Sequence, residues 1–143
     1  MCSSDLCTED MGVDDSIASF VLPLGMTINM DGTAIMQVIA TVFIAGCAGY
    51  DLTPMELVVI ALLALLASVG TPAAPGAGAV ILFTILSGVG FVNDKALLAY
   101  SLILAINRPI EMLVTSLNVV GDATSCICVA KSEGMLDEEK YNA

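Results

Sequence analysis

Residues 25–36, "GMTINMDGTAIM", place three polar side chains inside one of the most apolar neighbourhoods of the chain. The run "IASFVLPL" precedes them, and "AIMQVIATVFIAGCAG" overlaps their end and continues to residue 49. Asn29, Asp31 and Thr33 contribute an amide, a carboxylate and a hydroxyl, and Gly32 weakens helix formation. We therefore predict a membrane helix that is broken at 29–33 and leaves backbone carbonyls free at the break.

The overall composition is that of a membrane protein. Of 143 residues, 57% are hydrophobic and 13% are charged, and the mean hydropathy is +0.92. A domain of this size could not bury so much apolar surface in its own core. We therefore expect an all-α, multi-pass protein of the cell membrane, with the lipid bilayer as its surroundings.

The charge of the chain is acidic and lies mainly at its two ends. The formal net charge is −11, with acidic clusters at 9–15 and 137–139. This balance argues against nucleic acid as a partner, because phosphates attract basic residues. The basic residues are too few to set an orientation in the bilayer. They are Lys95, Arg108, Lys131 and Lys140.

The cysteines show no CxxC spacing, and the chain has no histidine. We therefore expect buried free thiols rather than a zinc site or a disulfide framework. The start, "MCSSDLCTEDMG", has no basic region followed by an apolar one, so no cleavable signal peptide is expected. The five cysteines are Cys2, Cys7, Cys47, Cys126 and Cys128.

Most of the apolar segments are too short to cross a bilayer as simple helices, which takes about 20 residues. Thr53, Pro54 and Glu56 predict a capping box and a helix that begins near residue 54. That helix must stop at "SVGTPAAPGAG" (68–78), which is rich in Gly and Pro. Two helices of about 14 residues around this tip predict a re-entrant hairpin. An extramembrane loop between short spans is the alternative, although the tip carries no charge.

The last apolar segment carries a polar stripe. Its helix should restart at "FVNDK" with Asn93 or Asp94 as the cap, and Pro109 should kink or break it. Five polar residues spaced 4, 4, 3 and 4 apart share one helix face. The stripe could face water or headgroups, but carboxylates in membrane helices usually mark an ion or substrate path, and oxygen donors suit hard cations. These residues are Asn107, Glu111, Thr115, Asn118 and Asp122.

Three motifs carry a family resemblance. "PLGMTINMDGTA" (23–34), "ASVGTPAAPGAG" (67–78) and "NVVGD" (118–122) resemble the dicarboxylate/amino acid:cation symporter family, which comprises the glutamate transporters and their neutral amino acid relatives. The resemblance covers residues 7–134 and only the C-terminal part of a family member. It implies a broken seventh helix unwound at "NMDG", a second re-entrant hairpin acting as a gate, and an eighth helix.

The expected segments follow from these motifs. We expect an N-terminal connecting segment with a truncated start, a broken membrane helix, a re-entrant hairpin, a final kinked membrane helix and an acidic polar tail. Residues 1–6 do not match what should precede the motifs, so a truncation or an assembly artefact is expected there. The boundaries are 1–16, 17–50, 51–92, 93–131 and 132–143, in that order.

The resemblance implies Na⁺ as the coupling ion and assigns its ligands. One family Na⁺ site matches Gly25, Asn29, Asn118 and Asp122. A second site, beneath the hairpin tip, matches Thr27, Ser68, Val69 and Thr71. Asn29 and Asp31 match part of a third.

The resemblance also assigns the substrate-binding residues, and this sequence departs from the family there. Glu111 and Val114 stand where acidic amino acid transporters have an aspartate and an arginine. Without that arginine a buried substrate carboxylate loses about 2–5 kcal/mol, and no other basic residue lies on the stripe. We therefore predict a small neutral amino acid, such as alanine, serine or threonine, as substrate. The substrate-binding residues expected are Met30, Thr33, Ala73, Ala74, Gly78, Glu111, Val114, Thr115 and Asn118.

The predicted function is thus Na⁺-coupled symport by an elevator-type transport domain, in a homotrimer, and not an enzyme. A symporter for dicarboxylates or acidic amino acids is the first alternative, and an inactive remnant is another. An intramembrane aspartic protease is a third, because "GYD" (49–51) and "GD" (121–122) faintly echo its motifs. The second motif lacks a glycine, which disfavours the protease.

Overall fold

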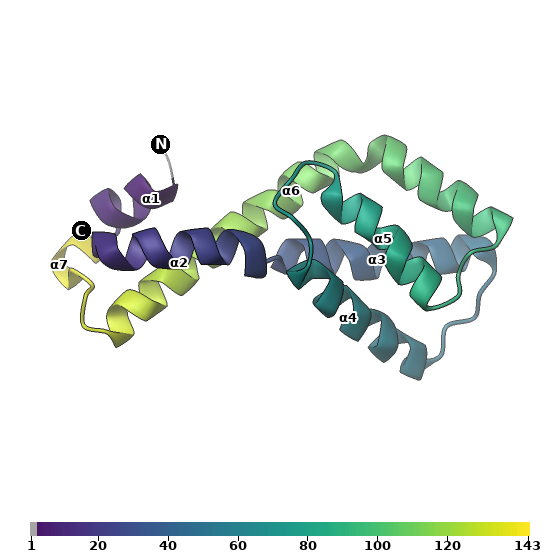
Figure 1. Cartoon of the computed structure of the whole chain (residues 1–143), viewed down its shortest axis with the longest axis horizontal. Helices are drawn as coiled ribbons and strands as arrows, with labels where there is room; N and C mark the ends of the chain where they lie inside the picture. The colour runs from purple at the N-terminus through teal and green to yellow at the C-terminus, as the bar shows by residue number, and fades with distance from the viewer. Residues whose placement is uncertain (1–2) are drawn as a thin grey trace.

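The computed structural model describes residues 3–143, and Cys2 lies outside this range. The described residues confirm the predicted all-α class, with a single isolated β-bridge beside the helices (Figure 1). The helices are α1 (Ser3–Asp5), η1 (Leu6–Asp10), α2 (Asp15–Ile28), α3 (Asp31–Ala48), α4 (Pro54–Val69), α5 (Ala77–Gly88), α6 (Asp94–Ser132) and α7 (Glu138–Tyr141).

The predicted helix break lies between α2 and α3 and is shorter than expected. Only Asn29 and Met30 leave helical geometry, with φ/ψ of −87°/90° and −121°/43°. Asp31 and Gly32 belong to the first turn of α3, so the prediction that "NMDG" is unwound throughout is wrong. A carboxylate in the first turn is favourable, because the helix N-terminus carries partial positive charge.

The two helices around the Gly/Pro tip are short. The predicted capping box of α4 is confirmed, since Thr53 Oγ1 accepts the Glu56 N–H at 3.3 Å and Glu56 accepts the Thr53 N–H at 2.8 Å. With 16 and 12 residues, α4 and α5 extend about 24 and 18 Å, less than the roughly 30 Å of a bilayer core. They are joined by the tip, residues 70–76.

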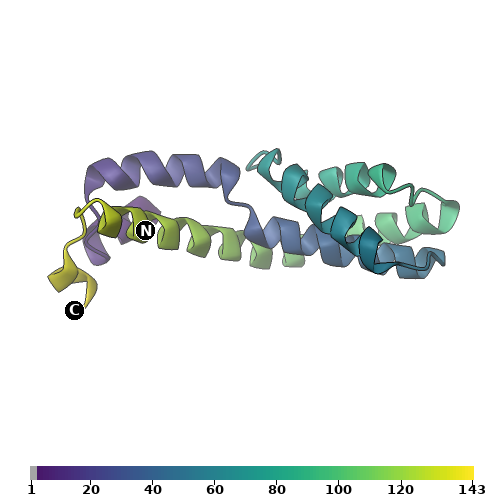
Figure 2. The same cartoon turned by 90° about the horizontal axis from the view of Figure 1, so that it is seen from below.

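The long helix α6 holds the molecule together. Asn93, one of the two residues predicted as its cap, accepts the Ala96 N–H at 2.9 Å. The helix continues through Pro109, so the alternative of a broken helix is wrong, and its ribbon bends between its ends (Figure 1). One part of α6 lies beside α2 and the other beside α3, while α4 and α5 pack on α3 (Figures 1 and 2).

Two separate hydrophobic clusters flank the helix break. The first joins α3, α4, α5 and the start of α6, with Ile44, Ile60 and Leu82 fully buried. The second joins η1, α2 and the end of α6 around Cys7, Leu22 and Cys126. The polar residues of the break therefore lie between two apolar cores rather than within one.

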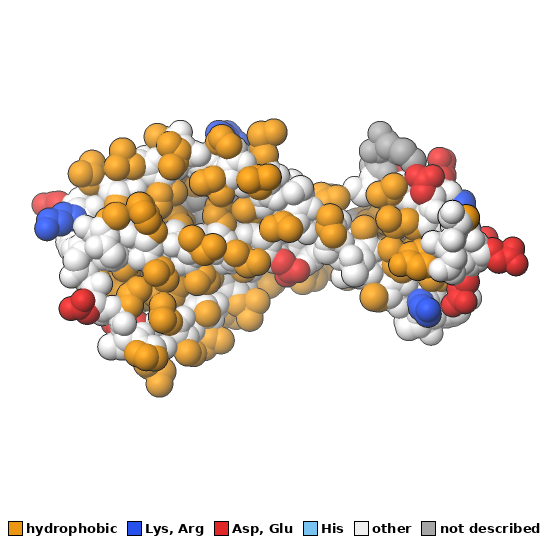
Figure 3. Space-filling model, turned by 180° about the vertical axis from the view of Figure 1, so that it is seen from behind, with side chains coloured by type: hydrophobic (Ala, Val, Ile, Leu, Met, Phe, Trp, Pro, Cys, Tyr) orange, Lys and Arg blue, Asp and Glu red, His pale blue; other side chains and the backbone are white. Residues whose placement is uncertain are grey.

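Much of the remaining apolar surface is exposed, as expected for a membrane protein. Among the described residues, 15–48 and 94–132 are long and apolar enough to cross a bilayer. Phe20 and Met112 are 70% and 75% exposed. Hydrophobic side chains are spread over the face seen in Figure 3, and most charges lie toward the two ends. A surface of this kind requires lipid or protein to cover it.

The acidic tail packs against the N-terminal segment. An isolated antiparallel bridge pairs Val13 with Leu136, and the Asp137 N–H donates to the Gly12 carbonyl at 2.8 Å. Residues 132–143 are therefore fixed to the start of the chain, which the sequence did not indicate.

The cysteines do not all follow the prediction of buried thiols. Cys7 and Cys126 are fully buried and hydrogen-bonded to each other, but Cys47 and Cys128 are exposed. Burial raises the pKa of the Cys7 thiol, although the hydrogen bond from Cys126 opposes this. The difference arises because Cys47 and Cys128 occupy helix faces that no other element of the described chain covers.

We expect maleimide to label Cys47, in the last turn of α3, and to leave Cys7 unlabelled in the folded chain. Cys7 combines complete burial with a raised pKa, and only the thiolate reacts. Peptide mapping by mass spectrometry measures both positions in one sample, and a chain unfolded in detergent is the control in which both should react. Equal labelling of Cys7 and Cys47 in the folded chain would contradict this packing of η1.

Candidate functional site

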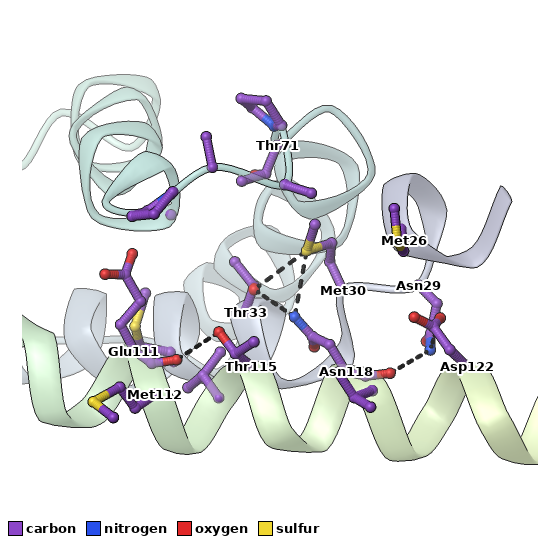
Figure 4. Close-up of a pocket in the computed structure, with 18 of the residues that line it drawn as sticks. Met26, Asn29, Met30, Thr33, Thr71, Glu111, Met112, Thr115, Asn118 and Asp122 are labelled. Carbon is purple, nitrogen blue, oxygen red and sulfur yellow. Dashed lines mark hydrogen bonds between the residues drawn. The ribbon is translucent and has the colours of Figure 1, made fainter. Parts of the chain in front are cut away.

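A pocket of about 840 Å³ opens where the helix break, the hairpin tip and α6 meet (Figure 4). This volume suits a small molecule. All nine residues that the sequence assigned to the substrate line it. The tip contributes Thr71, Pro72, Ala73, Ala74 and Pro75, and α5 contributes Gly78; α2, the break and α3 contribute Met26, Asn29, Met30, Thr33 and Met36; and α6 contributes Arg108, Glu111, Met112, Val114, Thr115, Asn118, Val119 and Asp122.

Asn118 connects α6 to the start of α3. Its Oδ1 accepts the Gly32 N–H at 2.9 Å, and its Nδ2 donates to Thr33 Oγ1 at 3.2 Å and to Met30 Sδ at 3.4 Å. The first N–H groups of a helix have no partner within it, and Met30 offers no side-chain cap. Asn118 therefore caps α3 from another helix and holds Met30 and Thr33 at the pocket (Figure 4).

Asn29 and Asp122 form the polar contact between the break and α6. Asn29 Nδ2 donates to Asp122 Oδ1 at 2.9 Å and to the Asn118 carbonyl at 3.1 Å. Gly25 and Gly121 allow this approach: a Cβ at Gly25 would collide with the Asp122 carboxylate, and one at Gly121 would lie 2.5 Å from Asn29 Nδ2. The four residues assigned to the first Na⁺ site thus lie together.

The donor set at this point suits a small hard cation. Asp122 is only 6% exposed, and its hydrogen-bond partner is the neutral amide of Asn29. Neither ion pair in the described part of the chain involves Asp122. A buried carboxylate without a cation is costly at membrane depth. Asp122 together with carbonyl and amide oxygens therefore fits Na⁺ by ligand chemistry.

The residues assigned to the second site are less closely connected. The hydroxyl groups of Thr27, Ser68 and Thr71 each donate to a backbone carbonyl within three or four residues. No hydrogen bond in residues 3–143 joins Thr27 to Ser68 or Thr71. Val69 is exposed at the end of α4, and Asp31, assigned to the third site, is exposed on the first turn of α3.

Glu111 already has partners, which the sequence did not indicate. Its Oε1 accepts the Gly76 N–H at 2.5 Å, and its Oε2 lies 3.0 Å from Arg108 Nη1. Arg108 also lines the pocket, although it lies beside the polar stripe of α6 and not on it. The spacing of three residues between Arg108 and Glu111 was the available signal, because residues i and i+3 are neighbours on a helix. Asn107 is buried but does not line the pocket.

The two aspartates of the protease alternative lie far apart. Asp51 is exposed in the loop that follows α3, whereas Asp122 contacts Asn29 just before α3 begins. The 18 residues of α3 separate these ends by roughly 27 Å. Two carboxylates at that separation cannot share a proton or a water, so a catalytic dyad is ruled out.

A helix break with a buried carboxylate, beside a pocket of small-molecule size in an apolar helical protein, is typical of membrane transport proteins. The chain belongs to the sodium:dicarboxylate symporter family, whose model matches residues 3–132. Family members are integral membrane transporters and not enzymes, which confirms the membrane location and the expected absence of catalysis.

The chain is similar to excitatory amino acid transporters. It is 43% identical over 116 residues to that of Onchocerca volvulus and to that of Caenorhabditis elegans, which covers 80% of this chain and 23% and 22% of the relatives. It is 42% identical over 118 residues to excitatory amino acid transporter 2 of Mus musculus, which covers 82% of this chain and 20% of the relative. The chain therefore spans about a fifth to a quarter of the length of these relatives.

Proposed function

We propose that this chain forms an ion- and substrate-binding part of a Na⁺-coupled amino acid symporter. The observation that carries the proposal is the buried Asp122 carboxylate, which lies beside Asn29 and Asn118 at the helix break. Na⁺ bound there would supply the positive charge that the protein itself does not place at Asp122. The short hairpin α4–α5 would be re-entrant, and its tip would gate the pocket.

Coupling between ion and substrate follows from the residues shared by the two sites. Asn118 offers its carbonyl to Asn29 on the ion side and its amide to Met30 and Thr33 on the pocket side. An ion that fixes Asn29 and Asn118 therefore also fixes the polar groups that face a substrate. Such preorganisation lowers the entropic cost of binding the second ligand.

For the substrate, we propose an acidic amino acid in preference to the neutral one predicted from the sequence. Arg108 supplies a cation in the pocket for a second carboxylate, and Glu111 supplies an anion for the ammonium group. The names of the relatives, excitatory amino acid transporters, support the same choice. Val114 favours the neutral hypothesis, because it adds an apolar side chain to the lining.

A competition assay separates the two substrate classes. In the C. elegans relative, residues 3–132 of this chain replace the matching segment, and Na⁺-dependent uptake of labelled aspartate is measured in proteoliposomes. We expect unlabelled aspartate to inhibit roughly tenfold better than alanine, because only aspartate gains a charge-assisted bond with Arg108. The unmodified relative is the control. Inhibition by alanine or serine but not by aspartate would overturn the acidic assignment in favour of the neutral one.

The resemblance further implies a homotrimer in which each transport domain carries substrate by an elevator-like motion. The trimer and the elevator-like motion are proposed for the complete transporter, because this chain spans only about a fifth to a quarter of the length of its relatives. The exposed apolar faces of α3 and α6 would then contact lipid or other segments of the complete transporter.

A further inference from the structure

Two fully buried polar side chains lie on one face of α3. Gln37 and Thr41 are both 0% exposed, and their spacing of four residues places them one turn apart on the same side of the helix. Ala40 and Ile44, on the same stretch of α3, belong to the first hydrophobic cluster. In residues 3–143, neither Gln37 Oε1 nor Thr41 Oγ1 has a hydrogen-bond partner. Two polar oxygens are therefore unsatisfied beside an apolar core.

The orientation of the Gln37 amide is fixed by α5. Its Nε2 donates to the Gly78 carbonyl oxygen at 3.4 Å. The reverse orientation would bring Oε1 to that carbonyl, where two acceptors would repel each other. Oε1 therefore points away from Gly78 and needs a donor from elsewhere. Because Gly78 lines the pocket, the Gln37 amide also positions part of the pocket wall.

Thr41 lacks the hydrogen bond that hydroxyl groups in helices commonly form. Those of Ser87, Ser101, Thr115 and Thr124 each donate at 2.8 Å to the backbone carbonyl four residues earlier. Within the described chain, the Thr41 hydroxyl has no acceptor. A buried polar group without a partner is costly, and such groups in native proteins usually bind ordered water.

We propose that one buried water molecule bridges Gln37 Oε1 and Thr41 Oγ1. Water donates to Oε1 and accepts the Thr41 hydroxyl proton, so it satisfies both side chains. A cation is disfavoured, because the only buried carboxylate among the described residues is Asp122, which contacts Asn29 before α3 begins. This water site does not depend on the proposed transport function, and either can be wrong without the other.

The direct test is nuclear magnetic resonance on the full chain in lipid nanodiscs. Gln37 is the only glutamine in the sequence, so ¹⁵N-glutamine gives side-chain amide signals from this residue alone. We expect a rotating-frame cross-peak between water and the Gln37 Nε2 protons, with the sign of proximity and not of proton exchange. Thr41→Ser keeps the hydroxyl and should keep the cross-peak, whereas Thr41→Val should lose it. Absence of the cross-peak in the unsubstituted chain would overturn the proposal.

The same signals separate water from a cation. With the Na⁺ concentration held constant, added KCl should leave the Gln37 amide signals unchanged. A saturable shift with KCl would overturn the water assignment in favour of a cation site at α3.

Unfolding of a double variant tests whether the two side chains share one ligand. Gln37→Met and Thr41→Val nearly keep the side-chain volumes and remove the polar oxygens. Each alone should raise the unfolding equilibrium constant by about 5- to 30-fold, because it leaves a partner of the water unsatisfied. The double variant should be no less stable than either single one, since replacing both partners by apolar groups leaves neither unsatisfied.

The matched control combines Gln37→Met with Thr124→Val. Thr124 is exposed on α6 and bonds within its own helix, so these two effects should multiply as for independent sites. Denaturant unfolding in detergent micelles compares the variants. If the effects of Gln37→Met and Thr41→Val also multiplied, the shared water molecule would be refuted.

Discussion

Replacing Asp122 with Asn is expected to weaken Na⁺ binding about 30-fold or more, because removal of one partner of a buried charge pair costs about 2–5 kcal/mol. The fold should survive, since the amide can still accept the hydrogen bond that Asn29 donates at 2.9 Å. Without Na⁺ the variant should be as stable as the unchanged chain, because an uncompensated buried carboxylate has been removed.

The measurement is the shift of the unfolding temperature with Na⁺ concentration, in the full chain in nanodiscs. A ligand that binds only the folded state stabilises it in proportion to the logarithm of its concentration. The unchanged chain should show this Na⁺ dependence and Asp122→Asn should lose it. Asp94→Asn, at the exposed start of α6, is the matched control. Identical Na⁺ dependence in all three proteins would refute the assignment of Asp122 as a ligand.

Replacing Gly32 with Ala is expected to destabilise the chain by about 2–3 kcal/mol, because an added methyl group has no room between α3 and α6. A Cβ at Gly32 would lie 2.6 Å from the Val114 carbonyl oxygen and 3.1 Å from Leu117 Cβ. The backbone of α6 cannot yield as a flexible side chain would. Separation of the helices would also lengthen the 2.9 Å bond from the Gly32 N–H to Asn118.

Gly46→Ala is the matched control in the same helix. Among the described residues, no atom outside the neighbouring turns of α3 lies within 4 Å of a Cβ at Gly46, and alanine should stabilise the helix interior by roughly 0.5–1 kcal/mol. Denaturant unfolding in detergent micelles compares the two variants. If Gly32→Ala proved as stable as Gly46→Ala, the close contact of α3 with α6 would be incorrect.

Local patterns predicted much of the architecture. The capping box at Thr53, the cap at Asn93 and the break before α3 all depend on residues within a few positions of one another, so the sequence alone could specify them. The spacing of polar residues on α6 likewise predicted one face, and four of its five members line the pocket. The family resemblance then assigned the nine expected substrate residues, all of which line that pocket.

The tertiary structure decided what depends on contacts between distant segments. Asn29 and Asp122 meet across 93 residues, and their hydrogen bond requires the glycines that let α2 approach α6. Arg108 lines the pocket with its guanidinium 3.0 Å from Glu111 Oε2, and the hydrogen bond from the Gly76 N–H to Glu111 requires the hairpin tip to lie over α6. Helix periodicity assigns a residue to a face of its own helix, but the partner of that face is determined only when the helices pack.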